Sequence, residues 1–258
     1  MADAKTPASV TPKGHAAWVR LCHWLIAGSV LTLAYSGIVI LMAHPRLYWG
    51  NVGNDLTRPL LELPLGPNYR HGGWGPAIAF FTDASGPVTR ARTFEIFNQN
   101  GWARSLHFLV AWCLVAAWTA YGLAGLLTGH VARTLLPKPG DLTPRRLWQD
   151  LTAHLKMPVP ATDGGPPYGL LQKCAYVGVA FLALPLMILT GLSMSPAVGA
   201  AWPFLPALFG GSQSARTVHF TVLCLLVLFL IAHLVMVVMS GWRRQMRAMT
   251  FGSSNRGE

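Results

Sequence analysis

Four long runs without a charged residue dominate the pattern of this chain. Each run contains the roughly 20 apolar residues that cross the hydrocarbon core of a bilayer. The charge-free runs are 21–45, 105–132, 174–215 and 217–242. Because only helices satisfy their own backbone groups in lipid at these lengths, the pattern predicts an all-α membrane protein, a four-transmembrane-helix bundle. The expected transmembrane helices lie near 17–43, 105–128, 170–194 and 215–240.

The segments outside these helices are polar or rich in turn-forming residues. We expect one membrane domain over 17–252, flanked by tails over 1–16 and 253–258. No small-x-small cleavage site closes the first apolar stretch, so the first helix is expected to stay as a span. The loop over 44–104 is rich in Gly, Pro and Trp and is predicted to form an ordered outer cap. A Pro-rich loop over 129–169 links the second and third helices on the inner side.

Composition and charge agree with a membrane protein. Hydrophobic residues make up 52% of the chain and charged residues 11%, whereas soluble domains carry about a quarter. The net charge of +11 comes from tails and loops, not from one folded face, which argues against a nucleic-acid partner. The positive-inside rule places both termini in the cytoplasm. The cations on that side are Lys5, Lys13, Arg20, Arg133, Lys138, Arg145, Arg146, Lys156, Arg243, Arg244, Arg247 and Arg256.

Histidine supplies the chemistry of the spans, since the sequence contains no CxxCH, Walker, GxSxG or HExxH motif. Four of the nine histidines lie within the expected helices, where ionisable groups are functional by default. His219 and His233 are fourteen residues apart, hence about 21 Å apart on nearly the same face of one helix. The direction of each helix puts His23 at the depth of His233 and His107 at the depth of His219.

Two imidazole pairs at two depths are the ligands that two haem groups require. Neutral imidazole binds iron, and residues on facing helices hold haem inside helix bundles. Two histidines per iron leave no open coordination position, which favours electron transfer over substrate binding. The alternative is that each histidine only hydrogen-bonds a neighbouring helix. The matched depths of the two pairs favour the metal sites.

Arginine stands three positions before three of these histidines, at Arg20, Arg104 and Arg216. Guanidinium and imidazole then share a helix face at the water boundary, where arginine can bind a haem propionate. The alternative is that these arginines only extend to the membrane interface. Gly37 lies fourteen positions after His23 and is expected to leave a gap for a flat macrocycle; close helix packing is the other explanation.

Several stretches resemble the bacterial cytochrome b561 and nickel-hydrogenase b-type cytochrome family, particularly thiosulfate reductase cytochrome b subunits. The resemblance covers roughly residues 16–252, and the ordered set with the fourteen-residue histidine pair is fairly specific. The long first outer loop departs from the shorter hydrogenase pattern. The stretches that carry the resemblance are Arg20-Leu-Cys-His23-Trp24, His44-Pro-Arg-Leu-Tyr-Trp-Gly50, Leu171-Gln-Lys-Cys-Ala-Tyr176 and Gly210-Gly-Ser-Gln-Ser-Ala-Arg-Thr-Val-His219.

The resemblance implies a di-haem b subunit of a bacterial inner membrane that exchanges electrons between a quinone and a soluble redox partner. In related subunits the first and fourth helices hold one haem, which corresponds to His23 with His233 here. The second and fourth helices hold the other, which corresponds to His107 with His219. The resemblance also implies a quinone near His233 and a periplasmic partner, and similar chains suggest a molybdopterin oxidoreductase. Two rival functions stay open: a stand-alone membrane oxidoreductase acting on a small molecule, and a haem-free anchor or transporter.

Overall fold

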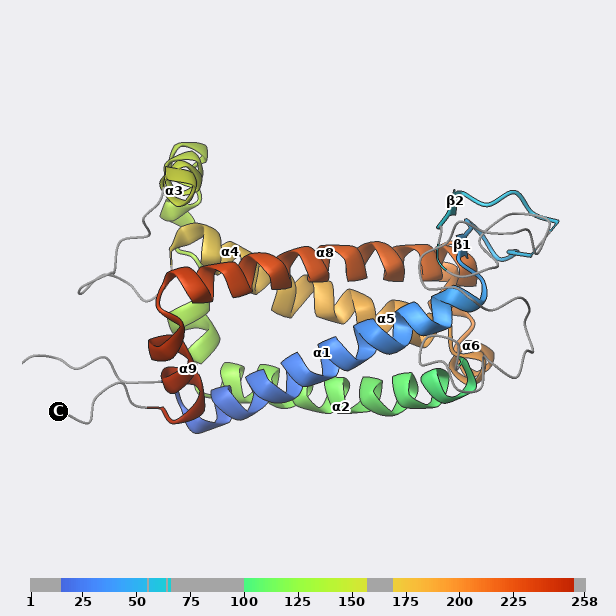
Figure 1. Cartoon of the computed structure of the whole chain (residues 1–258), viewed down its shortest axis with the longest axis horizontal. Helices are drawn as coiled ribbons and strands as arrows, with labels where there is room; N and C mark the ends of the chain where they lie inside the picture. Colours follow the sequence, from blue (N-terminus) through green and yellow to red (C-terminus); the bar gives the residue numbers. More distant parts are fainter. Residues whose placement is uncertain (1–14, 55, 64, 66–99, 157–168, 253–258) are drawn as a thin grey trace, which may run out of the picture.

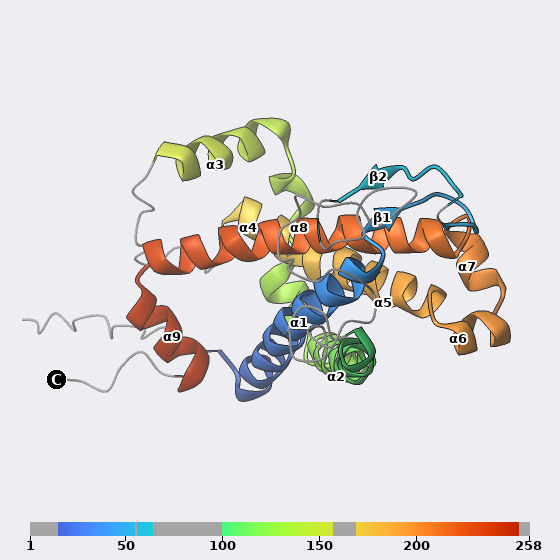
Figure 2. The same cartoon turned by 45° about the vertical axis from the view of Figure 1, so that its right-hand side comes forward.

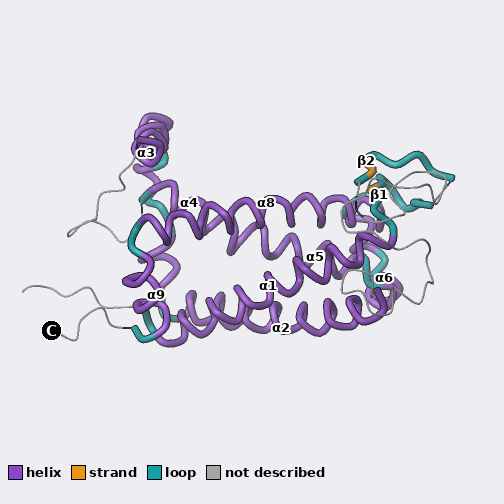
Figure 3. Tube along the Cα trace, viewed as in Figure 1, coloured by secondary structure: helices purple, strands orange, loops and turns teal. Residues whose placement is uncertain are grey.

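Four long helices lie side by side in the computed structural model, which describes residues 15–54, 56–63, 65, 100–156 and 169–252 (Figure 1). All four are long and apolar enough to cross a membrane. They alternate in direction along the chain (Figure 3), so the predicted bundle is confirmed, with the second and fourth helices starting slightly before their predicted positions. Their bounds are α1 Ala17–Ala43, α2 Asn100–Leu127, the continuous helix Leu170–Ser193 and α8 Ser212–Met239.

The third long helix changes its hydrogen-bond pattern in the middle. It consists of α4 (Leu170–Gly178), the π-helical turn η5 (Val179–Ala183) and α5 (Leu184–Ser193). Pro185 follows this turn and has no N–H, so the Ala180 carbonyl loses the donor that a π turn would give it. Trp118 of α2 replaces that donor: its indole N–H lies 2.6 Å from Ala180 O. The irregular turn thereby joins the third helix to α2.

Shorter elements cover the two ends of the bundle. At the end away from the start of α1, which we call the hairpin end, two strands pair antiparallel and two short helices follow the third long helix (Figure 1). These elements are β1 (Arg46–Leu47), β2 (Leu61–Glu62), α6 (Pro196–Ala201) and α7 (Phe204–Leu208). The described start of the expected cap is therefore ordered, whereas residues 66–99 lie outside the described part of the chain, as do 1–14 and 253–258.

The opposite end, which we call the α9 end, holds the start of α1 and the last helix of the chain (Figure 1). A loop was predicted over 129–169, but the described residues of this range include helical segments. The residues after Gly241 also form a helix. Both α3 and α9 place arginines among apolar side chains, the pattern of helices at a membrane surface. These segments are η3 (Val131–Leu135), η4 (Pro139–Asp141), α3 (Pro144–Lys156) and α9 (Trp242–Thr250).

The helices pack most extensively in two pairs, α1 with α2 and α5 with α8. The buried core between them contains Leu114 of α2, Leu184 of α5, and Val222 and Leu226 of α8. Many large apolar side chains of the spans are exposed, as lipid-facing positions require. The core therefore holds the four helices in a fixed rotation, and this rotation decides which side chains meet inside the bundle.

Candidate metal centres

Two pairs of histidines meet inside the bundle, one near each end. His107 of α2 and His219 of α8 have ring centres 6.4 Å apart, and we call them the hairpin-end pair. His23 of α1 and His233 of α8 have ring centres 6.3 Å apart, and we call them the α9-end pair. These are the two pairs predicted from helix direction and depth.

The hairpin-end pair is fixed on the α2 side by a serine of α1. Nδ1 of His107 lies 2.9 Å from Ser36 Oγ. The serine hydroxyl donates its only hydrogen to the Thr32 carbonyl at 2.8 Å, so it must accept a hydrogen from the imidazole. His107 is thereby held with its proton on Nδ1, which leaves the lone pair of Nε2 for a metal ion.

The α8 side of this pair is fixed in the same way by a threonine of α5. Thr190 Oγ1 lies 2.9 Å from Nδ1 of His219 and donates to the Leu186 carbonyl at 2.7 Å. Thr190 is fully buried, so water cannot replace these hydrogen-bond partners of its hydroxyl. His219 therefore also carries its proton on Nδ1. Outer partners of this kind orient metal-binding histidines and raise their basicity.

A glycine follows each of these two hydroxyl residues and packs against the same ring. A Cβ on Gly37 would lie 3.4 Å from Cε1 of His107, and a Cβ on Gly191 would lie 3.5 Å from Cε1 of His219. Gly37 was predicted as a gap for a macrocycle at this level, and the structure places it against the edge of an imidazole. Gly37 therefore lies at van der Waals distance beside the His107 ring, next to the serine that bonds it.

Aromatic side chains pack against both histidines of the α9-end pair. The ring of His23 lies edge-on to Trp24, with centres 5.2 Å apart. His233 stacks on Phe229 at 5.8 Å and meets the edge of Tyr176 at 6.2 Å. Nδ1 of His23 is buried and has no hydrogen-bond partner among the described residues. This pair therefore lacks, on the His23 side, the hydroxyl support that both rings have at the hairpin end.

The spacing of both pairs fits a single metal ion between two imidazoles. A metal–imidazole bond is about 2.1 Å long, so two imidazoles that shared one metal ion would have ring centres about 6.4 Å apart. The observed separations are 6.3 and 6.4 Å. His23 with His233, and His107 with His219, would each be able to hold one haem iron through two imidazole nitrogens. The donor sets at both ends therefore suit haem iron.

The three arginines predicted near these histidines have different surroundings. Arg20 donates from Nη1 to the Thr250 carbonyl at 3.2 Å, while its Nε is buried without a partner in the described part of the chain. Arg216 donates from Nη2 to the His44 carbonyl, so it ties the loop after α1 to α8. Arg104 is exposed at the start of α2. The unpaired Nε of Arg20 leaves a donor close to His23 for an anionic group.

Sequence reasoning missed Ser36, Thr190 and Gly191. A signal for them exists: a hydroxyl residue and a glycine stand side by side in the first and third helices, and Arg-x-x-His opens the second and fourth. Each hydroxyl-glycine pair holds the histidine of the next long helix. The two helix pairs thus repeat one arrangement at the hairpin end, which was not predicted.

Comparisons with known proteins show what the chain is similar to. The family model described as prokaryotic cytochrome b561 matches residues 14–252, which include all four paired histidines. A protein of Azospira oryzae, named "Putative protein-methionine-sulfoxide reductase subunit YedZ1", is 26% identical over 225 residues, covering 87% of this chain and 90% of that protein. No solved structure matches the chain.

Proposed function

Because the chain belongs to the prokaryotic cytochrome b561 family, we propose that it is a di-haem b electron-transfer subunit between the quinone pool and a periplasmic redox protein. The observation that carries the proposal is the equal separation of the two histidine pairs, 6.3 and 6.4 Å. A bound haem b at each pair would supply a one-electron carrier. The family supports haem b as the cofactor, and the number of two rests on the geometry.

The protein's own residues hold and tune these centres. His107 and His219 present Nε2 from facing helices because Ser36 and Thr190 fix their protons on Nδ1. Two histidines on each iron would leave no open position for substrate, which supports an electron-transfer subunit rather than a catalyst alone. The four histidines are partly buried between the long helices, and neutral imidazole is the form that binds iron.

The basic helices at the α9 end support a cytoplasmic position for that end and for both termini. Arg145, Arg146, Arg243, Arg244 and Arg247 lie on α3 and α9, and the positive-inside rule assigns such segments to the cytoplasm of a bacterial inner membrane. Lipid headgroups are then the neighbours of these helices. The hairpin end faces the periplasm, and the two pairs lie at different depths between the two faces.

This orientation assigns a partner to each end. The resemblance of the sequence to quinone-linked cytochromes supports a quinone site near His233, whose ring packs against Tyr176 and Phe229. The periplasmic redox partner would meet the hairpin end, close to His219. The relative from Azospira oryzae is named as a subunit of a protein-methionine-sulfoxide reductase, which supports a periplasmic reductase, of the molybdopterin class that similar chains suggest, as the partner.

The purified chain tests the proposal against its two rivals. We expect a b-type reduced-minus-oxidised spectrum and quinol oxidation only when a redox partner or an artificial acceptor is present. A stand-alone oxidoreductase would instead reduce or oxidise a small molecule without a partner protein. A haem-free anchor or transporter predicts no change in the visible spectrum, and this result would overturn the proposal.

A further inference from the structure

Helix α9 closes the α9 end of the bundle by crossing from the end of α8 to the start of α1 (Figure 2). Two side chains of α1 donate to its last turn. Arg20 Nη1 lies 3.2 Å from the Thr250 carbonyl and Trp24 Nε1 lies 3.0 Å from the Met249 carbonyl. Because Arg20 and Trp24 are four residues apart, they share one face of α1.

These bonds satisfy groups that α9 leaves unpaired. Met249 and Thr250 are the last two residues of the helix, so their carbonyls have no donor within it. Arg20 and Trp24 supply the donors from another helix, and the guanidinium also favours the negative end of the helix dipole. The contact continues to Gly252, which has a φ of +79° and lies against the Arg20 guanidinium.

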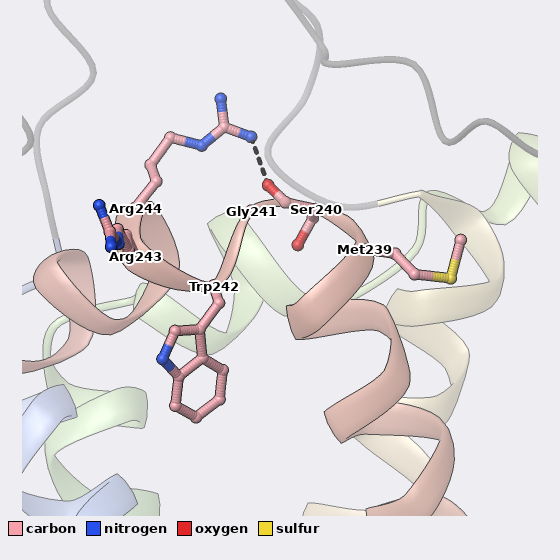
Figure 4. Close-up of a pocket in the computed structure, with 6 residues that line it drawn as sticks. All are labelled: Met239, Ser240, Gly241, Trp242, Arg243 and Arg244. Atoms are coloured by element: carbon pink, nitrogen blue, oxygen red, sulfur yellow. Dashed lines mark hydrogen bonds between the residues drawn. The ribbon is translucent and has the colours of Figure 1, made fainter.

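The bend between α8 and α9 is also fixed (Figure 4). Gly241 adopts a φ of +99°, which glycine adopts without strain. Arg244 donates from Nη2 to the Ser240 carbonyl at 2.8 Å, and Gln245 donates from Nε2 to Ser240 Oγ at 3.2 Å. α9 is thus attached to α8 at a set angle, and its other end is bonded to α1.

Helices α1 and α8 are the two that carry the α9-end pair. Trp24, which bonds α9, also lies edge-on against His23 with ring centres 5.2 Å apart. In the described part of the chain, Nδ1 of His23 has no hydrogen-bond partner. The position of its ring therefore depends on packing, and α9 joins the helix of His23 to the helix of His233.

We propose that Arg20 and Trp24 are positioning residues that clasp α9 to α1 and thereby hold His23 against His233. This inference rests on the proposed function, since it requires a haem at each pair. Haem at the α9-end pair then depends on α9, while haem at the hairpin-end pair does not. Arg20 acts here through α9 and not on a propionate.

The test uses the full chain with Ala248→Pro, and Ala248→Ser as its matched control. Proline in the helix interior breaks the last turn of α9 and displaces the two carbonyls, whereas serine leaves the turn intact. Haem titration of the apo-protein, with the two sites distinguished by their electron paramagnetic resonance signals, measures both affinities. We expect at least about tenfold weaker haem binding at the α9-end pair in Ala248→Pro, the size of effect seen when outer partners of a metal site are lost.

The hairpin-end haem reports that the variant is folded. Equal affinity at the α9-end pair in Ala248→Pro and Ala248→Ser would overturn the inference, and so would equal weakening of both haems. A wild-type chain that binds fewer than two haems would overturn the proposed function instead.

Trp24→Phe tests the clasp without changing α9, because it keeps a smaller aromatic ring against His23 and removes the indole N–H that bonds Met249 O. We expect weaker haem binding at the α9-end pair alone. Arg20→Met is then combined with Ala248→Pro. If Arg20 acts through α9, the double variant binds haem as the proline variant does. A further, multiplicative loss contradicts the positioning role of Arg20 and supports direct contact with a propionate.

Discussion

Thr190 accepts a 2.9 Å hydrogen bond from Nδ1 of His219 across the α5–α8 interface. Ser36 accepts the matching 2.9 Å bond from His107 across the α1–α2 interface. In both cases the hydroxyl hydrogen is already given to a carbonyl of its own helix, so the direction of the bond to the imidazole is fixed. Each half of the bundle therefore delivers one oriented imidazole to the same site.

Thr190→Val keeps the shape of the buried side chain and removes the hydroxyl. We expect the midpoint potential of the hairpin-end haem to rise, because a histidine that donates from Nδ1 is more basic and stabilises ferric iron. Haem affinity at this site should fall about tenfold to 100-fold. A potentiometric titration followed in the visible spectrum measures both haems at once. Thr190→Ser is the control and should keep the wild-type potential; a shift in the other haem would contradict the assignment.

Gly37 and Gly191 set a size limit beside the two rings of the hairpin-end pair. Because a Cβ at either position would lie 3.4 or 3.5 Å from an imidazole carbon, Gly37→Ala should be tolerated. Gly37→Val adds two methyl groups that have no room beside His107, so we expect loss of one haem. Pyridine haemochrome analysis counts the haem per chain. Two haems in Gly37→Val would show that the ring does not need this contact.

The Trp118 indole and Pro185 are coupled through the carbonyl of Ala180. Trp118→Phe leaves this carbonyl without its donor, and we expect a loss of about 1–3 kcal/mol in the free energy of unfolding. In the Pro185→Ala background the restored N–H can bond Ala180 O, so Trp118→Phe should cost less. Unfolding by denaturing detergent, applied to all four members of this cycle, measures the coupling. If the two substitutions change the free energy of unfolding additively, Trp118 and Pro185 are not coupled through the Ala180 carbonyl.

His15 and His130 lie outside the spans at the α9 end and predict a loss of stability in acid. Burial lowers the pKa of His15 below its ordinary value of 6.5, with further lowering from His130 and Arg20. Burial and Arg133 lower the pKa of His130. The unfolded chain therefore binds more protons at mildly acidic pH, so stability is full above about pH 6.5 and falls as the pH drops through that value toward the lowered pKa.

Thermal unfolding in detergent between pH 8 and 5 measures this effect. The double variant His15→Asn with His130→Asn should show a flatter dependence on pH than wild type. A wild-type protein that becomes more stable below pH 6.5 would contradict the assignment.

The spans and the histidine pairs could be predicted from the sequence because both depend on helix geometry alone. Charge-free length defines a span, and a rise of about 1.5 Å per residue places His233 fourteen residues deeper than His219. The hydroxyl supports could not be predicted in this way, since Ser36 and Thr190 meet the rings only through the rotation of nearly uniformly apolar helices. The docking of α9 depends likewise on tertiary bonds from Arg20, whose predicted role concerned only the haem.

The irregular third helix and the helices of the predicted inner loop could not be predicted from the sequence for other reasons. The π turn before Pro185 and the bond from Trp118 depend on the neighbouring helix, so the sequence alone did not predict them. The arginine and tryptophan pattern of α3 is readable in the sequence as a surface helix. Its prolines, including Pro144 at the first helical position, favoured a loop, although proline is common at that position.

The proposed function requires that each of the two histidine pairs holds one haem. The haem content of four single variants tests this requirement most directly. Pyridine haemochrome analysis of the purified wild-type chain should give two haem b per chain. His107→Ala and His219→Ala should each lose the same haem, recognised by one paramagnetic resonance signal, and His23→Ala and His233→Ala should each lose the other. One haem in the wild type, or loss of different signals within one pair, would contradict the account.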